Sequence, residues 1–413
     1  MSLSLPKFQI AILCALNTEY TAICNQLDQN LADCGVVIAR SASDRNAYTA
    51  GVIRGHPIIV ARIQDTGKSA AALTAANLSA THKGIKLCIL MGICAGAPRN
   101  AENQPIFLGD VIISTHVYNS DHGRLRDTGL ERYKEDIQQL SRLERGIKAL
   151  VDKCSNDYDK PRIEEEVNNR VDRSMQDSKL PARYKYPGVT EDRLFRPTHP
   201  HRHWEQESKC KHCAVDVHSS CRFASGISCV ELGCGKIRNA LVSRMRRPGR
   251  GAVELLDSLR SENLRPSIQL HFGPLSSADH VLRSSTLRDQ QNILDEVIGY
   301  EMEAAGIWDC LPTIVIKGVS DYADAHKNKE FQGYAAVTSA ATVHTVLQHW
   351  HLDSEAACTS KMHAKMVRSG KYKSYYLQAR NSVGRSGREQ ASNPSWQDGG
   401  KFFSPFRLST YSI

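Results

Sequence analysis

The feature that most constrains the fold is a series of short apolar runs without the polar alternation of a half-exposed strand. These runs are QIAILCAL at 9–16, HPIIVARI at 56–63, LCILMGI at 87–93, DVIISTHV at 110–117 and TIVIKGV at 313–319. Runs of this length that are rich in β-branched residues predict strands covered on both faces. An alanine-rich segment at 69–81 lies between two of them and predicts a helix. The sequence therefore predicts an α/β fold around a mostly parallel sheet.

The regular pattern of strands and helices is interrupted in the middle of the chain. Segment 155–203 is charged, interrupted by proline and poorly periodic, and 208–266 adds cysteines and a basic run at 236–250. Helical spacing returns near 284–296 and again in a closing segment at 334–350. We therefore expect one α/β domain over 1–351, a partly disordered insertion within it at 155–266, and a disordered basic tail at 352–413.

Membrane and secretory signals are not visible in the sequence. The chain has no stretch of about eighteen apolar residues, and its first fifteen residues lack a basic segment followed by a small-residue cleavage site. Several of the thirteen cysteines lie inside apolar runs, which fits a reducing compartment better than a disulfide framework. These observations predict a soluble cytoplasmic protein that does not bind membranes.

The net charge of +9 is concentrated at one end of the chain. Residues 352–413 contain ten Lys or Arg and four Asp or Glu, a balance of +6 that leaves +3 for the remainder. We expect the tail and the 236–250 run to be solvated charge, and we do not expect a nucleic-acid partner.

Acidic residues follow several of the predicted strands. Asp321 lies just past the strand predicted at 313–319, Glu19 follows the first strand, and Gly92 opens a small-residue turn that includes 94–98. Glu301 and Glu303 are two residues apart, so on an extended segment both would face one side. Each has a structural alternative as a cap, a turn residue or a solvated helical turn. Because ligands of α/β sheets bind beyond the carboxyl ends of the strands, their convergence predicts one site.

A group of cysteines in the insertion could bind a metal. Cys210 and Cys213 form a C-x-x-C motif, and a structural zinc there would hold together a loop that lacks a core. However, Cys221, Cys229 and Cys234 form no second close pair of the zinc-ribbon type. We therefore expect no metal site and keep zinc at Cys210 and Cys213 as the alternative.

Eight stretches of the chain, in order, resemble the nucleoside phosphorylase and nucleosidase superfamily. This group includes purine nucleoside phosphorylase, uridine phosphorylase and methylthioadenosine/adenosylhomocysteine nucleosidase. The resemblance is to a fungal branch found at the N-terminus of multidomain immune-receptor-like proteins. The matching stretches lie at 10–20, 65–72, 90–98, 108–114, 186–195, 271–281, 300–307 and 317–336. The resemblance implies a three-layer α/β/α domain around a mixed, mostly parallel sheet, and a homo-oligomer in which a neighbouring subunit completes the pocket.

The resemblance also implies cleavage of the N-glycosidic bond of a purine nucleoside or nucleotide. Asp321 matches the aspartate that hydrogen-bonds and protonates N7 of the purine, and Glu303 matches the glutamate that holds the ribose hydroxyls. Glu19 matches the acid that activates water in the hydrolytic members. Met302 matches the methionine under the sugar, and Ser277 lies in the segment that forms the base pocket.

Hydrolysis is favoured over phosphorolysis, which is a glycosyl transfer to phosphate. A phosphate dianion calls for bidentate arginines, yet the loop 15–20 has no basic residue and Ile93 stands where a hydroxyl donor could be. Lys68 and Arg124 remain candidate phosphate ligands. We expect Gly92, Ile93, Ser320 and Lys68 to contact the substrate, and no cofactor other than inorganic phosphate in the phosphorolytic case.

Three departures from the family pattern favour the alternative of a noncatalytic nucleoside-sensing or interaction module. Ala95 stands where relatives have a glycine, so a backbone position that needs positive φ would be restricted. Ala278 also replaces a glycine, and Val281 stands where some members place a base-stacking aromatic residue.

Overall fold

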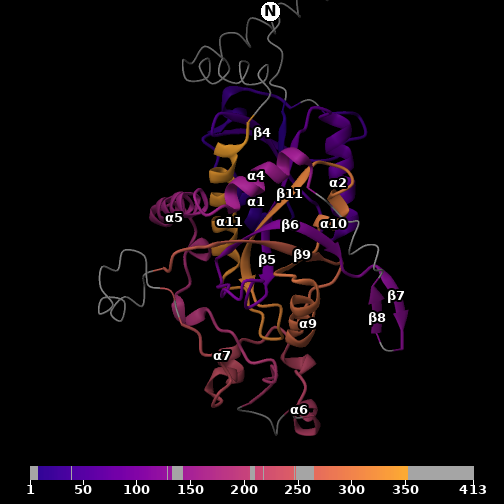
Figure 1. Cartoon of the computed structure of the whole chain (residues 1–413), viewed down its shortest axis with the longest axis vertical. Helices are drawn as coiled ribbons and strands as arrows, with labels where there is room; N and C mark the ends of the chain where they lie inside the picture. Colours follow the sequence, from indigo (N-terminus) through magenta and orange to yellow (C-terminus); the bar gives the residue numbers. More distant parts are fainter. Residues whose placement is uncertain are drawn as a thin grey trace, which may run out of the picture.

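The computed structural model describes residues 8–38, 40–127, 129–132, 143–204, 210–216, 218–245, 247 and 265–351. Its centre is a nine-stranded sheet with the order β10-β9-β6-β11-β5-β1-β4-β3-β2 (Figure 1). The predicted tail at 352–413 and part of the basic run at 236–250 lie outside the described residues. The α/β fold with a mixed, mostly parallel central sheet is confirmed.

The strands of the large sheet coincide with the apolar runs and add several that the sequence did not reveal. Their bounds are β1 Ile10–Cys14, β2 Gln29–Asn30, β3 Tyr48–Ile53, β4 His56–Arg62, β5 Leu87–Gly96, β6 Val111–Asn119, β9 Leu270–Ser277, β10 Gly299–Glu301 and β11 Thr313–Asp321. A separate hairpin is formed by β7 Gly123–Arg126 and β8 Gly129–Arg132.

Part of the sheet closes on itself. The central strands β1, β5 and β11 are parallel neighbours, so their carboxyl ends lie along one edge. Short strand β10 pairs in parallel with β9 and also antiparallel with β5, at Tyr300 opposite Ala95. The five strands β5, β11, β6, β9 and β10 therefore form a closed ring, which brings the end of β10 to the same edge as β5 and β11.

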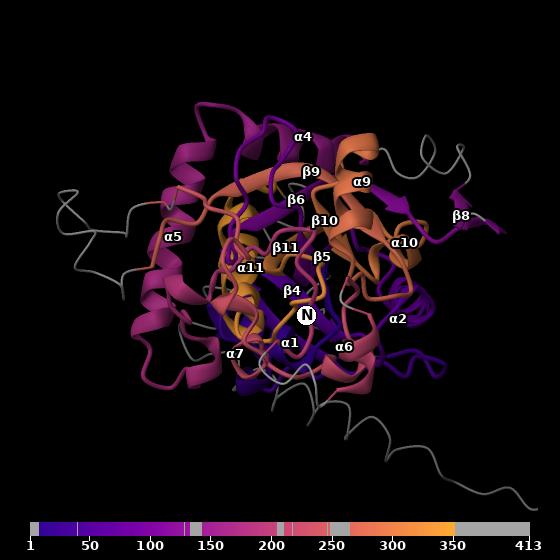
Figure 2. The same cartoon turned by 90° about the horizontal axis from the view of Figure 1, so that it is seen from below.

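Helices cover both sides of the sheet. Figure 2 shows α5 and α11 on one side, and α2 and α10 on the other. The helices are α1 Asn17–Cys24, α2 Lys68–Thr81, α4 Arg145–Ser155, α5 Lys160–Gln176, α6 Lys211–Val215, α7 Cys229–Leu232, α9 Ser285–Asp295, α10 Ala304–Ile307 and α11 Gln332–Val346. Helix α11 is buried from Gly333 to Val346 because it packs against the sheet on one side and against α1 and α5 on the other. An all-round small and apolar composition suits a helix in that position.

The structure corrects the expected irregularity of 155–203. Its first part forms the 17-residue helix α5, whose residues Ile163, Val167 and Val171 belong to the main hydrophobic core. Arg244 and Arg247, in the run expected to be solvated charge, instead pair with Asp192 and Asp110. The expected small-residue turn at 94–98 is also wrong in part, because β5 continues to Gly96.

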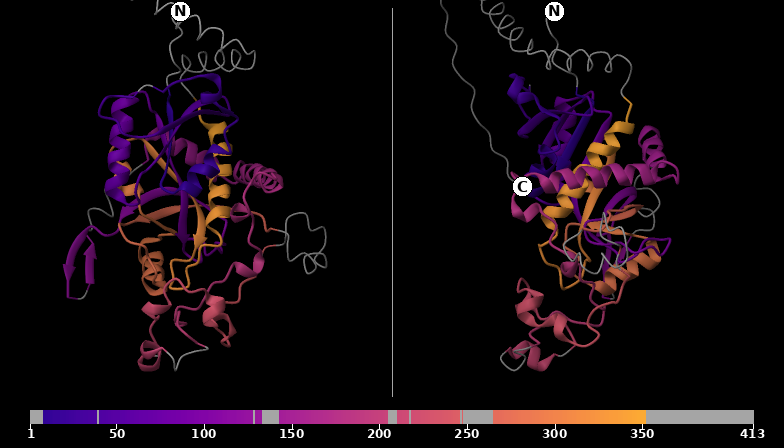
Figure 3. Two further views of the ribbon diagram at one scale, coloured as in Figure 1. Left: turned by 180° about the vertical axis from the view of Figure 1, so that it is seen from behind. Right: turned by 90° about the vertical axis from the view of Figure 1, so that its left-hand side faces the viewer.

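Helices α6 and α7 lie at the opposite end of the described structure from β4, and the β7–β8 hairpin projects from its side (Figure 3). The small unit that contains α6 and α7 has its own core, separate from that of the sheet. Within the described residues, none of the helices has the length and apolar character needed to cross a membrane.

Candidate active site

A pocket lies beyond the carboxyl ends of β1, β5 and β11, where the sequence predicted a site. It is lined by separate segments of the chain that the sheet brings together. The lining residues used below are Glu19, Thr66, Ile93, Ala95, Ser276, Ala278, His280, Val281, Glu301, Met302, Glu303, Ser320 and Lys327.

Glu19 is buried at the start of α1 and is held by three backbone N–H groups. Its Oε2 atom accepts hydrogen bonds from the N–H groups of Ala15 and Leu16, each at 2.8 Å, and Oε1 accepts one from Ile93 at 2.8 Å. Glu19 therefore caps α1, as the structural alternative predicted, and also joins that helix to β5. Burial raises the pKa of this carboxyl above its ordinary value, although Lys317 and the backbone donors act against the rise.

Gly92 makes room for this carboxylate. A Cβ atom on residue 92 would lie 2.2 Å from Oε1 of Glu19, far closer than van der Waals contact. Gly92, which we expected to contact the substrate, is not among the lining residues; its neighbour Ile93 is, and the Ile93 N–H donates to the Glu19 carboxylate.

Glu301 and Glu303 lie on either side of Met302, where the chain leaves β10 and enters α10. Both carboxylates are buried, so they do not form a solvated helical turn. The segment is extended only as far as Glu301, and Glu303 has helical backbone angles, which lets Met302 line the pocket together with both glutamates. Glu301 caps α10 by accepting hydrogen bonds from the N–H groups of Glu303 and Ala304, whereas Oε1 of Glu303 accepts one from Gly67 at 3.4 Å.

A buried lysine stands at the centre of these acids. The Nζ atom of Lys317, on β11, lies 3.3 Å from Oε2 of Glu303 and 3.6 Å from Oε2 of Glu301. Burial would lower the pKa of Lys317, but the charges of Glu303, Glu301 and Glu19 raise it well above its ordinary value. Lys317 is therefore a permanent cation that neutralises part of the acidic cluster.

Asp321 ends β11 at a bulge and lies just behind the pocket wall. Its Oδ2 atom is 2.9 Å from Oγ of Ser320 and 3.0 Å from Nζ of Lys327, and both of these residues line the pocket. Its Oδ1 atom accepts a hydrogen bond from the N–H of Ala323, which has a positive φ of 52°. A non-glycine residue in this conformation is strained, which is typical of functional sites.

The other predicted residues divide into lining and supporting positions. Ile93 and Ser320 line the pocket, while Ser277 is fully buried and accepts a hydrogen bond from the N–H of Ala305. Ser276 takes the lining position instead. Lys68 is not among the lining residues, since its Nζ atom binds Asn119 at 2.7 Å and pairs with Asp121.

The three departures from the family pattern have small structural effects. Ala95 lies inside β5 and is not among the described residues with positive φ, so the expected restriction at this position is wrong. The N–H of Ala278 donates to the carbonyl of Glu301, again without positive φ. Val281 is half exposed on the pocket wall and leaves that side open.

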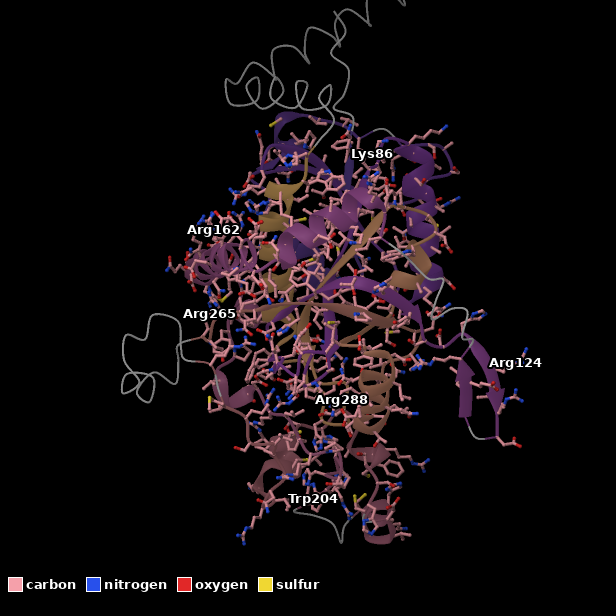
Figure 4. The ribbon with its side chains drawn as sticks, viewed as in Figure 1. Lys86, Arg124, Arg162, Trp204, Arg265 and Arg288 are labelled. Atoms are coloured by element: carbon pink, nitrogen blue, oxygen red, sulfur yellow. The ribbon has the colours of Figure 1, made fainter. Side chains whose placement is uncertain are left out.

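Cations suited to a phosphate dianion are scarce around the pocket. The basic residues among its lining positions are Lys327 and His280, and arginine is not among them. Arg124, one of the predicted phosphate ligands, lies on the projecting β7–β8 hairpin (Figure 4). The acidic groups of the site outnumber its lysines.

Comparison with known proteins gives relatives of low identity. The chain matches no protein-family model. A nucleotide-binding leucine-rich repeat (NLR)-like protein from Hyaloscypha variabilis is 26% identical over 346 residues, which is 82% of this chain and 29% of that protein. The chain thus spans less than a third of this relative.

Similar solved structures include two bacterial hydrolases. One is 5'-methylthioadenosine/S-adenosylhomocysteine nucleosidase from Neisseria meningitidis, with 16% identity, a TM-score of 0.43, and coverage of 82% of this chain and 98% of that chain. Another is futalosine hydrolase of Helicobacter pylori, with 15% identity, a TM-score of 0.45, and coverage of 83% of this chain and 98% of that chain.

Proposed function

We propose that this pocket hydrolyses the N-glycosidic bond of a purine nucleoside or nucleotide. The observation that carries the proposal is that Glu19 and Glu303 line one pocket and Asp321 lies just behind its wall, paired with the lining residue Lys327, although the three acids come from distant parts of the chain. The resemblance of the surrounding stretches to nucleosidases assigns the same three residues to the reaction.

The charge of the site suits the transition state of this reaction. Departure of a purine leaves positive charge on the ribose ring, and fixed carboxylates stabilise such a cation. Glu303 lines the pocket, whereas Lys317 is not among the lining residues. The single charge of Lys317 neutralises only part of the charge of Glu301 and Glu303. We assign Glu303 to the ribose hydroxyls and to this stabilisation.

Glu19 is suited to activate water. Its carboxylate is fixed by three backbone donors, and its raised pKa makes it a stronger base than an ordinary glutamate. In the proposed step, Glu19 takes one proton from a water molecule while the water oxygen bonds to the anomeric carbon.

The leaving purine takes a proton at N7 as the C–N bond breaks. Asp321 is the assigned donor, and the Lys327 ammonium, 3.0 Å from Oδ2, is the source from which Asp321 is supplied. The water oxygen and one of its protons stay on the sugar. When the products leave, Glu19 releases the other proton to solvent and Lys327 regains one from solvent, so the full cycle consumes one water molecule.

The same geometry disfavours phosphate as the nucleophile. Lys317 is already paired with two carboxylates, and Lys68 is paired with Asp121. A dianion entering a pocket edged by Glu19, Glu301 and Glu303 would meet repulsion instead of bidentate donors.

A noncatalytic nucleoside-sensing module is the second candidate. The ion pair that Lys327 makes with Asp321 supports it, because a purine N7 must displace or share that partner. The NLR-like relative is in keeping with such a role. This module would bind nucleosides in calorimetry without releasing a base.

Base release from adenosine, inosine, methylthioadenosine, AMP and ATP tests the proposal. We expect one of these compounds to yield free base, and Asp321→Asn and Glu303→Gln to lower the rate by at least about 10²-fold. Asp309→Asn, an exposed aspartate outside the pocket, is the matched control and should keep the full rate. Binding without release from any of the five would support the sensing module instead.

A further inference from the structure

Two groups of cysteine and histidine side chains have converging ligand atoms, and all of these residues except His326 lie in the insertion. The first group is His201, Cys229, Cys234 and His326, and the second is His203, Cys210, Cys213 and Cys221. In each group the four ligand atoms lie within 4.8 Å of one another. We infer that each group binds a structural zinc ion, and that the first ion anchors the insertion to the loop that carries Lys327.

The distances in the first group are those of a tetrahedral zinc site. Its Nδ1 atoms of His201 and His326 are 3.3 Å apart, and Sγ of Cys229 lies 3.7 and 3.5 Å from them. Sγ of Cys234 lies 3.6 Å from Nδ1 of His201. With zinc bonds of about 2.05 Å to nitrogen and about 2.3 Å to sulfur, a tetrahedron has N–N edges of about 3.3 Å and N–S edges of about 3.6 Å.

Hydrogen bonds around the first group orient both imidazoles for metal binding. The Nε2 atom of His201 is 3.2 Å from the carbonyl oxygen of Ala224, and Nε2 of His326 is 2.9 Å from that of His199. Because a carbonyl oxygen only accepts, each Nε2 carries the proton, and each Nδ1 presents a lone pair to the other. A proton shared between the two Nδ1 atoms would provide a partner for these two nitrogens alone. A divalent cation would bind both nitrogens and both cysteine sulfurs.

The second group has the composition and spacing of a Cys₃His site. Sγ of Cys210 lies 3.8 Å from Sγ of Cys221, the edge expected between two zinc-bound sulfurs, and Sγ of Cys213 is 3.5 Å from Nδ1 of His203.

A buried arginine accompanies the second group. Three thiolates and one Zn²⁺ leave a net charge of −1, and Arg202, which is 1% exposed, binds the carbonyl oxygen of Cys213 at 2.5 Å. Trp204, labelled in Figure 4, stacks on His199 and lies under the Arg202 guanidinium. The positive charge of Arg202 lies beside a site that would carry net negative charge. The first group, with two thiolates, would be neutral with Zn²⁺.

The insertion needs bound metal ions to hold it together because its own hydrophobic core is small. Cysteines make up three of its seven buried core residues, and Phe223, Val215 and Val230 are exposed. A unit of this size rarely folds on apolar burial alone, and bound zinc supplies folding free energy directly.

The first group also reaches the proposed active site. His326 immediately precedes Lys327, whose Nζ atom pairs with Asp321. The imidazole ring of His326 stacks on Phe195 of the insertion, with ring centroids 3.8 Å apart. The N–H of His326 donates to Oδ1 of Asp324 at 2.9 Å, so the loop after β11 is fixed at both ends. A zinc ion on His326 therefore positions Lys327 through the backbone.

Metal analysis of the untagged full chain, purified without chelator, tests this inference. We expect two zinc ions per chain, falling to one in Cys234→Ala and to one in Cys213→Ala, while Cys34→Ser keeps both because Cys34 is outside the two groups. Should either variant fail to fold, cobalt exchanged into the wild-type protein should show thiolate-to-metal charge-transfer absorption together with tetrahedral d–d bands.

Disulfides are the competing explanation of the close sulfurs. Alkylation and mass spectrometry of the unreduced protein distinguish the two. Free but metal-protected thiols at Cys210, Cys221, Cys229 and Cys234 are expected, and chelator should make them reactive. Disulfide-linked peptides from these positions, or a metal-free folded protein with freely reactive thiols, would overturn the inference.

Discussion

Gly92 and Glu19 are packed so closely that residue 92 has no space for a side chain, since its Cβ atom would lie 2.2 Å from Oε1 of Glu19. The contact fixes the carboxylate that we assign to water activation. Gly92→Ala should therefore displace Glu19 and lower kcat for base release by about 10²-fold, since shifts of about 1 Å have such effects. Gly146→Ala, whose Cβ would meet its nearest neighbour at 3.6 Å, is the matched control and should be fully active. Full activity in a folded Gly92→Ala protein would remove Glu19 from the mechanism.

Lys317→Met should destabilise the fold strongly. The change leaves the buried carboxylates of Glu301 and Glu303 without their shared cation, and breaking such a buried group costs about 3–5 kcal/mol. Urea unfolding measures the loss. Lys86→Met, at an exposed lysine that Figure 4 labels, should change stability by no more than about 0.5 kcal/mol. Equal stability of the two variants would show that Lys317 does not balance the acids.

Lys327→Met distinguishes two roles of the ion pair with Asp321. As the source of the proton delivered to the purine, Lys327 should be needed for turnover, and kcat should fall about 10²-fold with little change in KM. The exposed neighbour Lys329 gives the control variant Lys329→Met, which should be unaffected. A faster Lys327→Met enzyme would mean that the lysine blocks Asp321 instead of supplying it.

The pH dependence of kcat/KM should report Glu19. Because burial raises its pKa, the base form is lost on acidification at a pH above the ordinary glutamate value of about 4.3. The acid limb of the profile should therefore lie above that pH. The Glu19→Gln variant should lose nearly all activity, and its residual activity should show no such acid limb. An acid limb at or below the ordinary value would assign the titration to another group.

Asp110 should make stability depend on pH through a different site. Burial acts to raise the pKa of Asp110, but Arg247 and His271 lower it well below the ordinary value. A depressed folded pKa means that the stabilisation is present above the unfolded value of about 3.9 and is lost as pH falls below it. Asp110→Asn should cost about 3–5 kcal/mol at neutral pH, and the deficit should shrink below about pH 4. A deficit that is constant with pH in urea unfolding would contradict this.

Much of the site could be predicted because strand ends are visible in the sequence. The apolar runs before Glu19 and Asp321 place these residues at one edge once the strands are parallel. Lys317 was missed as a counter-ion, although a single lysine inside the apolar run TIVIKGV is itself a signal, because a buried ammonium needs carboxylate partners.

Other features were hidden by their surroundings or by distance along the chain. Helix α5 was missed because its apolar positions Ile163, Val167 and Val171 are separated by charged residues, which obscured the helical spacing. The cysteine spacing alone shows no second close pair, because both groups proposed to bind zinc include histidines, and His326 is 92 residues beyond Cys234. Sequence spacing cannot reveal a ligand that folding brings from the other side of the domain.

The identity of the sugar product tests the central claim most directly. With the nucleoside or nucleotide that yields base, a reaction in phosphate buffer is analysed by chromatography and mass spectrometry for both products. We expect one free sugar for each free purine, and no new bond between the sugar and phosphate. If the substrate is a nucleotide, the released sugar keeps only the phosphate that it carried in the nucleotide. A sugar 1-phosphate formed in step with the base, or no base at all, would contradict hydrolysis at this site.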